Sequence, residues 1–153
     1  MADSPWLSDQ EQQVWRQYLN ISRRLQERIE RDMQRQAGMP QAYYLILAML
    51  SEAPGHSLRM NQLADILSAS QSRTSHAVAR LEEQGWVRRE RTPEDGRGQI
   101  ALLTDAGWVR VQELAPGHAD TVRCTMFDAL DAADLSDLRR IYDKIAAKLE
   151  ALG

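Results

Sequence analysis

The segment LADILSASQSRTSHAVARLEEQGWVRRERTPEDGRGQIALLTDAG, residues 63–107, decides the fold of this chain. The segment starts inside a short predicted helix over residues 61–67. A serine-rich turn separates that helix from a second one over residues 71–84. Two strand candidates follow, WVRRER at residues 86–91 and QIALL at residues 99–103. Two helices joined by a tight turn and followed at once by a β-hairpin form a winged helix-turn-helix.

The second predicted helix has one apolar and one polar face. The apolar face should pack against the first helix, for which we expect Asn61 to be the N-terminal cap. The polar face combines short hydrogen-bonding side chains with arginines, which are the side chains that contact base edges and phosphates in DNA. The alternative is an αα-hairpin whose polar face is only solvated, but the adjoining hairpin favours the winged helix. The inward residues are Thr74, Ala77, Val78 and Leu81, and the outward residues are Gln71, Ser72, Arg73, Ser75, His76 and Arg80.

The tip of the predicted hairpin carries one arginine, Arg97, between Gly96 and Gly98. Glycine lets the backbone turn sharply because it has no Cβ to clash. A narrow minor groove attracts an isolated guanidinium. We therefore interpret Arg97 as a minor-groove contact, and the alternative is a surface arginine in a flexible loop.

Long helices are predicted on both sides of the winged helix. A helix over residues 8–37 begins with a capping box, Ser8 and Glu11, and an apolar helix follows Pro40. The last helix should begin near Asp134, after a helix that Pro116-Gly117 should bend or break. One chain of this size cannot easily cover the apolar stripes of the first and last helices, so we expect a homodimer. These stripes are Val14, Tyr18, Ile21, Leu25 and Ile29, and Leu135, Leu138, Ile141, Tyr142, Ile145 and Leu149.

The predicted fold class is mainly α with a small β-hairpin wing. Residues 1–153 should form a single domain, with dimerisation helices at about 8–37 and 105–153 and a winged-helix lobe at about 40–104. The net charge is −3, and residues 58–100 contain seven arginines and six acidic residues, so a DNA-binding surface must be local. A single cysteine, a polar N-terminus and short apolar runs lead us to expect a cytoplasmic protein.

Other kinds of chemistry find little support in the sequence. It contains no phosphate-binding glycine loop, no nucleophile elbow and no metal-like Cys/His spacing, so we expect no enzyme, cofactor or metal site. Cys124 is more simply a small buried residue than a redox switch, and we expect His56 and His118 to be solvated. A winged helix that binds only proteins remains an alternative, although such modules usually need an apolar patch where this chain has arginines.

The segment that decides the fold also resembles the DNA-binding core of the MarR family of winged-helix transcriptional regulators. The most specific features are Asp95-x-Arg97 and the following Leu103-Thr104-x-x-Gly107, which match the family's wing and the exit from it. The resemblance implies that the outward residues of the second helix lie in or beside the major groove. It also implies that Arg97 enters the minor groove and that Asp95 orients it.

The resemblance further implies a homodimeric, ligand-responsive regulator, most often a repressor, that binds a pseudo-palindromic operator in double-stranded DNA. The usual effectors of the family are small phenolic or other aromatic compounds, often anionic. By resemblance, they bind where the DNA-binding lobe meets the dimerisation helices. The candidate effector-pocket residues are Trp15, Tyr18, Tyr43, Tyr44 and Met49.

Arg97→Ala should weaken operator binding while the dimer stays folded, because a wing tip contributes little to the core. A dimer loses two charge contacts, so the slope of log affinity against log salt should become shallower by roughly 1.8, about 0.9 per contact. Asp95→Ala should give a partial version of this loss. Salt-dependent binding of each variant measures both effects, and an unchanged Arg97→Ala slope would mean that the wing is only a loop.

Overall fold

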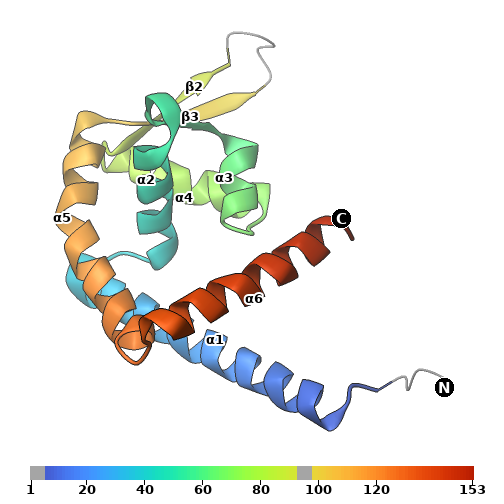
Figure 1. Ribbon diagram of the computed structural model, residues 1–153. Coiled ribbons are helices and arrows are strands. Elements are labelled where there is room, and N and C mark those ends of the chain that lie inside the picture. The colour runs from blue at the N-terminus through green and yellow to red at the C-terminus, as the bar shows by residue number, and fades with distance from the viewer. Residues whose placement is uncertain (1–5, 93–97) are drawn as a thin grey trace.

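The computed structural model describes residues 6–92 and 98–153 of the chain. Within these residues it is mainly helical with one small antiparallel sheet, as predicted (Figure 1). The predicted order of elements is also confirmed. The helices are α1 (Asp9–Ala37), α2 (Gln41–Glu52), α3 (Met60–Ile66), α4 (Gln71–Glu83), α5 (Asp105–Val122) and α6 (Ala132–Glu150), and the strands are β1 (Ser57–Arg59), β2 (Val87–Arg91) and β3 (Gln99–Leu103).

Helix α2 forms the centre of the main core. Its apolar residues cover most of its circumference, and Ile46, Leu47 and Leu50 are fully buried. They pack in one cluster with Leu63 of α3 and with apolar residues of α4 and the sheet. Burying each such side chain contributes about 1.5–3 kcal/mol relative to leaving it exposed. This cluster holds α3 and α4 in place beside the sheet.

The three strands pair in the order β1-β3-β2, and both pairings are antiparallel. Val87 and Ala101 lie on the face that packs against the helices, and both are buried. At the described base of the hairpin, the backbone N–H and the hydroxyl of Thr92 both donate to the carbonyl of Gly98, at 2.9 and 3.1 Å. The positions of the last residues of β2 and the first of β3 are therefore fixed relative to each other.

Thr104 and Gly107, three residues apart after β3, have specific roles where the chain leaves the sheet and enters α5. The Thr104 hydroxyl donates to the Gly85 carbonyl at 2.6 Å and accepts from the Gly107 N–H at 3.0 Å, so it caps α5. Gly107 lies so close to Trp86 that a Cβ would overlap the Trp86 carbonyl oxygen. These contacts join the start of α5 to the end of α4.

Two predicted helix boundaries are wrong. Asn61 is not the cap of α3, because the helix begins one residue earlier, directly after β1 ends at Arg59. The Gln62 side chain accepts from the Arg59 N–H at 2.9 Å, which fixes this start. The sequence also predicted α6 near Asp134, whereas Asp131 caps it, with its side chain accepting from the Asp134 N–H.

The prediction at Pro116 was a bend or a break of the helix, and α5 passes through this residue without a break. Tertiary packing outweighs the lost backbone hydrogen bond, because Val111, Leu114 and Thr121 are buried on the two sides of the proline. A Cβ at Gly117 would overlap the side-chain oxygen of Gln36 in α1, so this flexible side chain would have to move aside. The irregular part of the helix comes later, as a π-helical turn over Arg123–Phe127.

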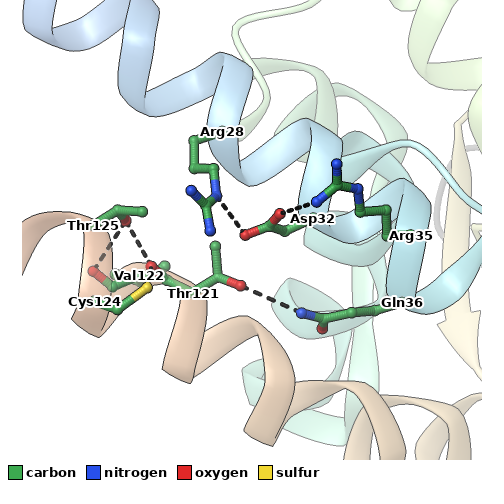
Figure 2. Close-up of polar contacts among 8 residues, drawn as sticks. All are labelled: Arg28, Asp32, Arg35, Gln36, Thr121, Val122, Cys124 and Thr125. Atoms are coloured by element: carbon green, nitrogen blue, oxygen red, sulfur yellow. Dashed lines mark hydrogen bonds and ion pairs between the residues drawn. The ribbon is translucent and has the colours of Figure 1, made fainter.

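A hydrogen bond joins the C-terminal half of α1 to the C-terminal end of α5 (Figure 2). Arg28 donates to Asp32 at 2.7 Å, and the hydrogen bond holds the pKa of this carboxyl below its ordinary value. Gln36 donates to the Thr121 hydroxyl at 3.4 Å. Cys124 donates to the Thr121 carbonyl at 3.3 Å and is exposed in the single chain, so the expectation that it is buried is wrong.

The N-terminal half of α1 and the whole of α6 extend away from the lobe as separate helices (Figure 1). The capping box at Ser8 and Glu11 is present, but buried residues of α1 begin only at Ile29. Helix α6 has no buried residue, and Leu149 is 63% exposed. The apolar stripes of both helices are therefore open in one chain. No helix in the described part of the chain combines the length and apolar composition that a membrane span requires.

Candidate nucleic-acid interface

Helix α4 presents the predicted polar face to solvent. Its inward residues, Thr74, Ala77, Val78 and Leu81, are all buried, and Leu63 and Ala64 of α3 are buried opposite them. Ser70 caps the helix, with its side chain accepting from the Arg73 N–H at 3.2 Å. Of the six residues predicted to face outward, five are exposed and Ser75 is half-buried. The exposed five are Gln71, Ser72, Arg73, His76 and Arg80.

Ser75 differs from the other five because it contacts the sheet. Arg89 of β2 donates to the Ser75 hydroxyl at 3.2 Å. The same guanidinium donates to the Glu82 carboxylate at 2.7 Å from Nε and pairs with it at 2.6 Å from Nη2. The Arg89 backbone N–H also donates to Glu82, at 2.8 Å. We call this set of contacts the Glu82–Arg89 bridge, and it connects α4 to β2 over two turns of the helix.

The sequence reasoning did not identify Arg89 or Glu82 as residues of this surface. A signal for Arg89 was present, because side chains alternate between the two faces of a strand. Val87 is buried against the helices, so Arg89 must face the same way. A charged side chain directed toward a helical layer needs a partner there. No comparable signal singled out Glu82 among the acidic residues at the end of α4.

The remaining arginines of the lobe have different surroundings. Arg80 pairs with Glu83 at 2.8 Å, and Arg88, on the outer face of β2, pairs with Glu90 at 3.2 Å. Both pairs are well exposed, and such pairs contribute little to stability. Arg80, on the outward face of α4, can therefore exchange its carboxylate for a phosphate. Arg97 and Asp95, the predicted wing residues, lie outside the described residues.

The structure does not bring the five candidate effector-pocket residues together in one chain. Tyr43, Tyr44 and Met49 lie on α2 where it meets the lobe core and α1. Trp15 and Tyr18 stack on each other at 5.6 Å between ring centroids, but they are 51% and 52% exposed. Tyr44 packs against Met33, and the helical rise places Tyr18 about 22 Å along α1 from that residue.

His118 lies beside Tyr44, contrary to the expectation that it is solvated. The two rings are 4.6 Å apart between centroids, and the Nδ1 atom of His118 has no hydrogen-bond partner among the described residues. Burial lowers the pKa of His118 below its ordinary value. His56 is exposed, as expected. Within residues 6–92 and 98–153, no group of His, Cys, Asp and Glu side chains is arranged to hold a metal ion.

The α3–turn–α4 unit and the β2–β3 hairpin define a winged helix-turn-helix protein. Residues 37–98 match the family model described as MarR family. The crystal structure of Sco3205, a MarR family transcriptional regulator from Streptomyces coelicolor, in complex with DNA, is 45% identical in sequence. The match covers 97% of this chain and 93% of that one, with a TM-score of 0.88. The chain belongs to the MarR family of transcriptional regulators.

Two further relatives agree with this assignment. AbsC, a MarR family transcriptional regulator from Streptomyces coelicolor, is 38% identical over 97% of this chain and 99% of its own, with a TM-score of 0.87. The transcriptional repressor MprA of Escherichia coli (strain K12) is 23% identical over 115 residues. That match spans 75% of this chain and 65% of the length of MprA.

A variant of Arg89 can show whether this residue fixes the hairpin to α4 or contacts DNA directly. Arg89→Met removes the guanidinium and keeps an unbranched side chain, so the fold should survive while α4 and the hairpin lose their fixed relative position. Operator affinity should fall by on the order of tenfold. The salt slope should stay unchanged, because Arg89 contacts Glu82 instead of a phosphate.

Fluorescence anisotropy at several salt concentrations measures both quantities. Arg88→Met is the matched control, because Arg88 lies on the same strand, and its exposed ion pair is with Glu90 of that strand. The control should bind like the wild type. A shallower slope for Arg89→Met, with no change in Arg88→Met, would mean that Arg89 itself contacts the DNA backbone.

Proposed function

We propose that this protein is a transcriptional repressor that binds specific sequences of double-stranded DNA as a homodimer. The observation that carries the proposal is the exposed polar face of α4, which is fixed to the hairpin through the Glu82–Arg89 bridge. A helix of this kind enters the major groove with its polar residues toward the base edges. The candidate DNA contacts are Gln71, Ser72, Arg73, His76 and Arg80. Ser75 is the sixth candidate, and its hydroxyl also accepts a hydrogen bond from Arg89.

Arginines and short polar side chains perform different tasks in such an interface. Arg73 and Arg80 can make bidentate contacts to guanine or bind phosphates, and Gln71 can pair with adenine. The side chains of His76 and Ser72 are short, so they reach the base edges only when the helix lies deep in the groove. Asp95 and Arg97 complete the proposed interface from the wing, in the roles that the family resemblance implies.

The open apolar stripes of α1 and α6 support the homodimer. Trp15 and Tyr18 on α1, and Ile141, Tyr142 and Ile145 on α6, are each 44–52% exposed in one chain. Contiguous apolar patches of this kind on a folded protein mark an interface. A second copy of the chain supplies the same two stripes in return, as a twofold interface requires.

A ligand response is part of the proposal. A small aromatic or phenolic effector would bind where the lobe meets α1 and α5, and Tyr43, Tyr44 and Met49 remain its candidate contacts. An effector that prefers the free dimer must weaken operator binding by the same factor, typically worth about 1–3 kcal/mol. A panel of aromatic compounds that neither shifts the melting temperature nor releases DNA would argue against an effector of this class.

A dimer with two recognition helices should select a pseudo-palindromic operator. Its half-sites should lie about 10–11 base pairs apart, because the two helices enter successive major grooves on one side of the duplex. Selection of bound duplexes from a random pool, followed by sequencing, determines the preferred site. If no sequence is enriched over random DNA, the alternative of a winged helix that binds only proteins gains support.

Ile145→Glu should weaken the dimer, since it places a charge in the apolar stripe of α6. Ala147→Glu is the matched control, because residue 147 is also exposed and lies about 200° away around the helix. Sedimentation at several concentrations should show dissociation or loss of folded protein for Ile145→Glu alone. Equal dimer stability in both variants would place the interface elsewhere.

A further inference from the structure

Trp86 connects the end of α4 to the region where the lobe meets α1. It lies between α4 and the first residue of β2, Val87. Its main chain is held on both sides, because its N–H donates to the Leu81 carbonyl at 3.1 Å and its carbonyl accepts from the Thr104 N–H at 3.0 Å. Its side chain is half-buried and packs both against the main core around α2 and against the smaller apolar cluster that joins α1, α2 and α5.

Arg110 of α5 contacts the Trp86 ring and the end of α1 at the same time. Its guanidinium carbon lies 5.3 Å from the centre of the Trp86 ring, which is the arrangement of a cation–π interaction. Its Nη2 atom donates a long hydrogen bond, at 3.5 Å, to the carbonyl of Ala37, the last residue of α1. The last carbonyls of a helix form its negative end, so a cation is favourable there. One guanidinium therefore links α1, α5 and the end of α4.

The surroundings of Arg110 show that the ring contact determines its position. The side chain is 25% exposed, so water competes with its contacts less than it does at the exposed Arg80. The Nε atom is buried and has no hydrogen-bond partner among residues 6–92 and 98–153. A buried N–H without an acceptor is unfavourable, so hydrogen bonding alone does not account for this placement. The attraction between the guanidinium and the Trp86 ring does.

A small rotation at Trp86 has a large effect at the far end of α4. Helix α4 runs from Gln71 to Glu83, so its two ends are about 18 Å apart. A rotation of about 10° at the Trp86 end would move Gln71 by about 3 Å, which is close to the rise of one base pair. In a dimer, both copies of α4 are subject to this effect. The distance between them therefore depends on how firmly the end of α4 is held against α1.

We propose that Trp86 and Arg110 set the spacing between the two half-sites that the dimer recognises. The proposal rests on the proposed function, because it takes the homodimer to bind a pseudo-palindromic operator through its two α4 helices. The open apolar stripe of α1 places this helix in the proposed dimer interface. Arg110 holds the Trp86 ring against the end of α1 and thereby fixes the angle between α4 and the dimer region. Both act as positioning residues, at a distance from the duplex.

Duplexes that differ only in the spacing of their half-sites test the proposal with the full-length protein. The probes are the selected operator, the same operator with one base pair added or removed at its centre, and a duplex with a single half-site. The wild type should prefer the selected spacing on the order of tenfold, since one base pair displaces a half-site by about 3.4 Å and rotates it around the duplex. Arg110→Met should reduce this preference on the order of fivefold, because the cation–π contact is lost. Its binding to the single half-site should stay unchanged, because the lobe remains intact.

Three further variants separate the ring contact from other effects. Arg110→Lys retains a cation beside the ring and should keep most of the spacing preference. Trp86→Phe keeps a smaller ring between the two clusters and should lose part of the preference, and it provides the test if thermal unfolding shows that Arg110→Met does not fold. Glu113→Gln is the matched control, because it removes only the exposed ion pair that Arg110 makes at 3.0 Å. This control should behave like the wild type.

The outcomes distinguish this inference from the proposed function. If the wild type selects no duplex, the proposed function and the inference fail together. If it selects an operator but binds all spacings equally, or if Arg110→Met and Trp86→Phe both keep the full spacing preference, only the inference fails. An equal loss of affinity on all spacings, or a loss on the single half-site, would mean that the pair only supports the fold of the lobe. That result would also overturn the inference.

Discussion

The proposed DNA-contacting surface of this protein depends on the bridge between Glu82 and Arg89. One glutamate accepts from both the backbone and the side chain of Arg89, and the same guanidinium reaches Ser75 two turns earlier on α4. The contact is charge-assisted, and each of its two side chains is only about a quarter exposed. Water therefore screens it less than it screens the surface ion pairs of the lobe. It adds a polar link between α4 and β2 to the apolar contacts that these two elements make in the core cluster.

The rest of the lobe supports this arrangement from behind. The α2 core fixes the inner faces of α3 and α4, and the Thr104–Gly107 turn fixes the start of α5 against the end of α4. A second, smaller cluster of Met33, Met39, Tyr44 and Leu114 joins α1, α2 and α5. Through this cluster, a change in the proposed dimer region can alter the position of the lobe. The half-buried His118, beside Tyr44, lies at the same joint.

The sequence predicted the elements well where the signal was local. The structure confirms the capping box of α1, the inward face of α4 and the hairpin strands, which all follow from short-range patterns. Of the bend or break predicted at Pro116, the break does not occur, because packing of α5 against α1 overrides the local preference. Asn61 failed as a cap for a similar reason, since pairing of β1 with β3 set where α3 begins.

The site was predictable only in part, for physical reasons. Amphipathic spacing identified which residues of α4 face outward, but it could not show that Ser75 is held by a strand residue. Periodicity along one element carries no information about partners on another, so Glu82 and Arg89 required the tertiary structure. The candidate pocket residues were grouped by residue type, and the length of α1 separates Trp15 and Tyr18 from the others.

We infer that α4 and the hairpin act as one rigid unit on DNA and that the dimer presents two such units. Hydroxyl-radical footprinting of the dimer on its selected operator tests this most directly. The account predicts two protected backbone segments, one in each half-site, separated by about one helical turn of 10–11 base pairs. A single protected segment, or protection spread evenly along the duplex, would contradict it.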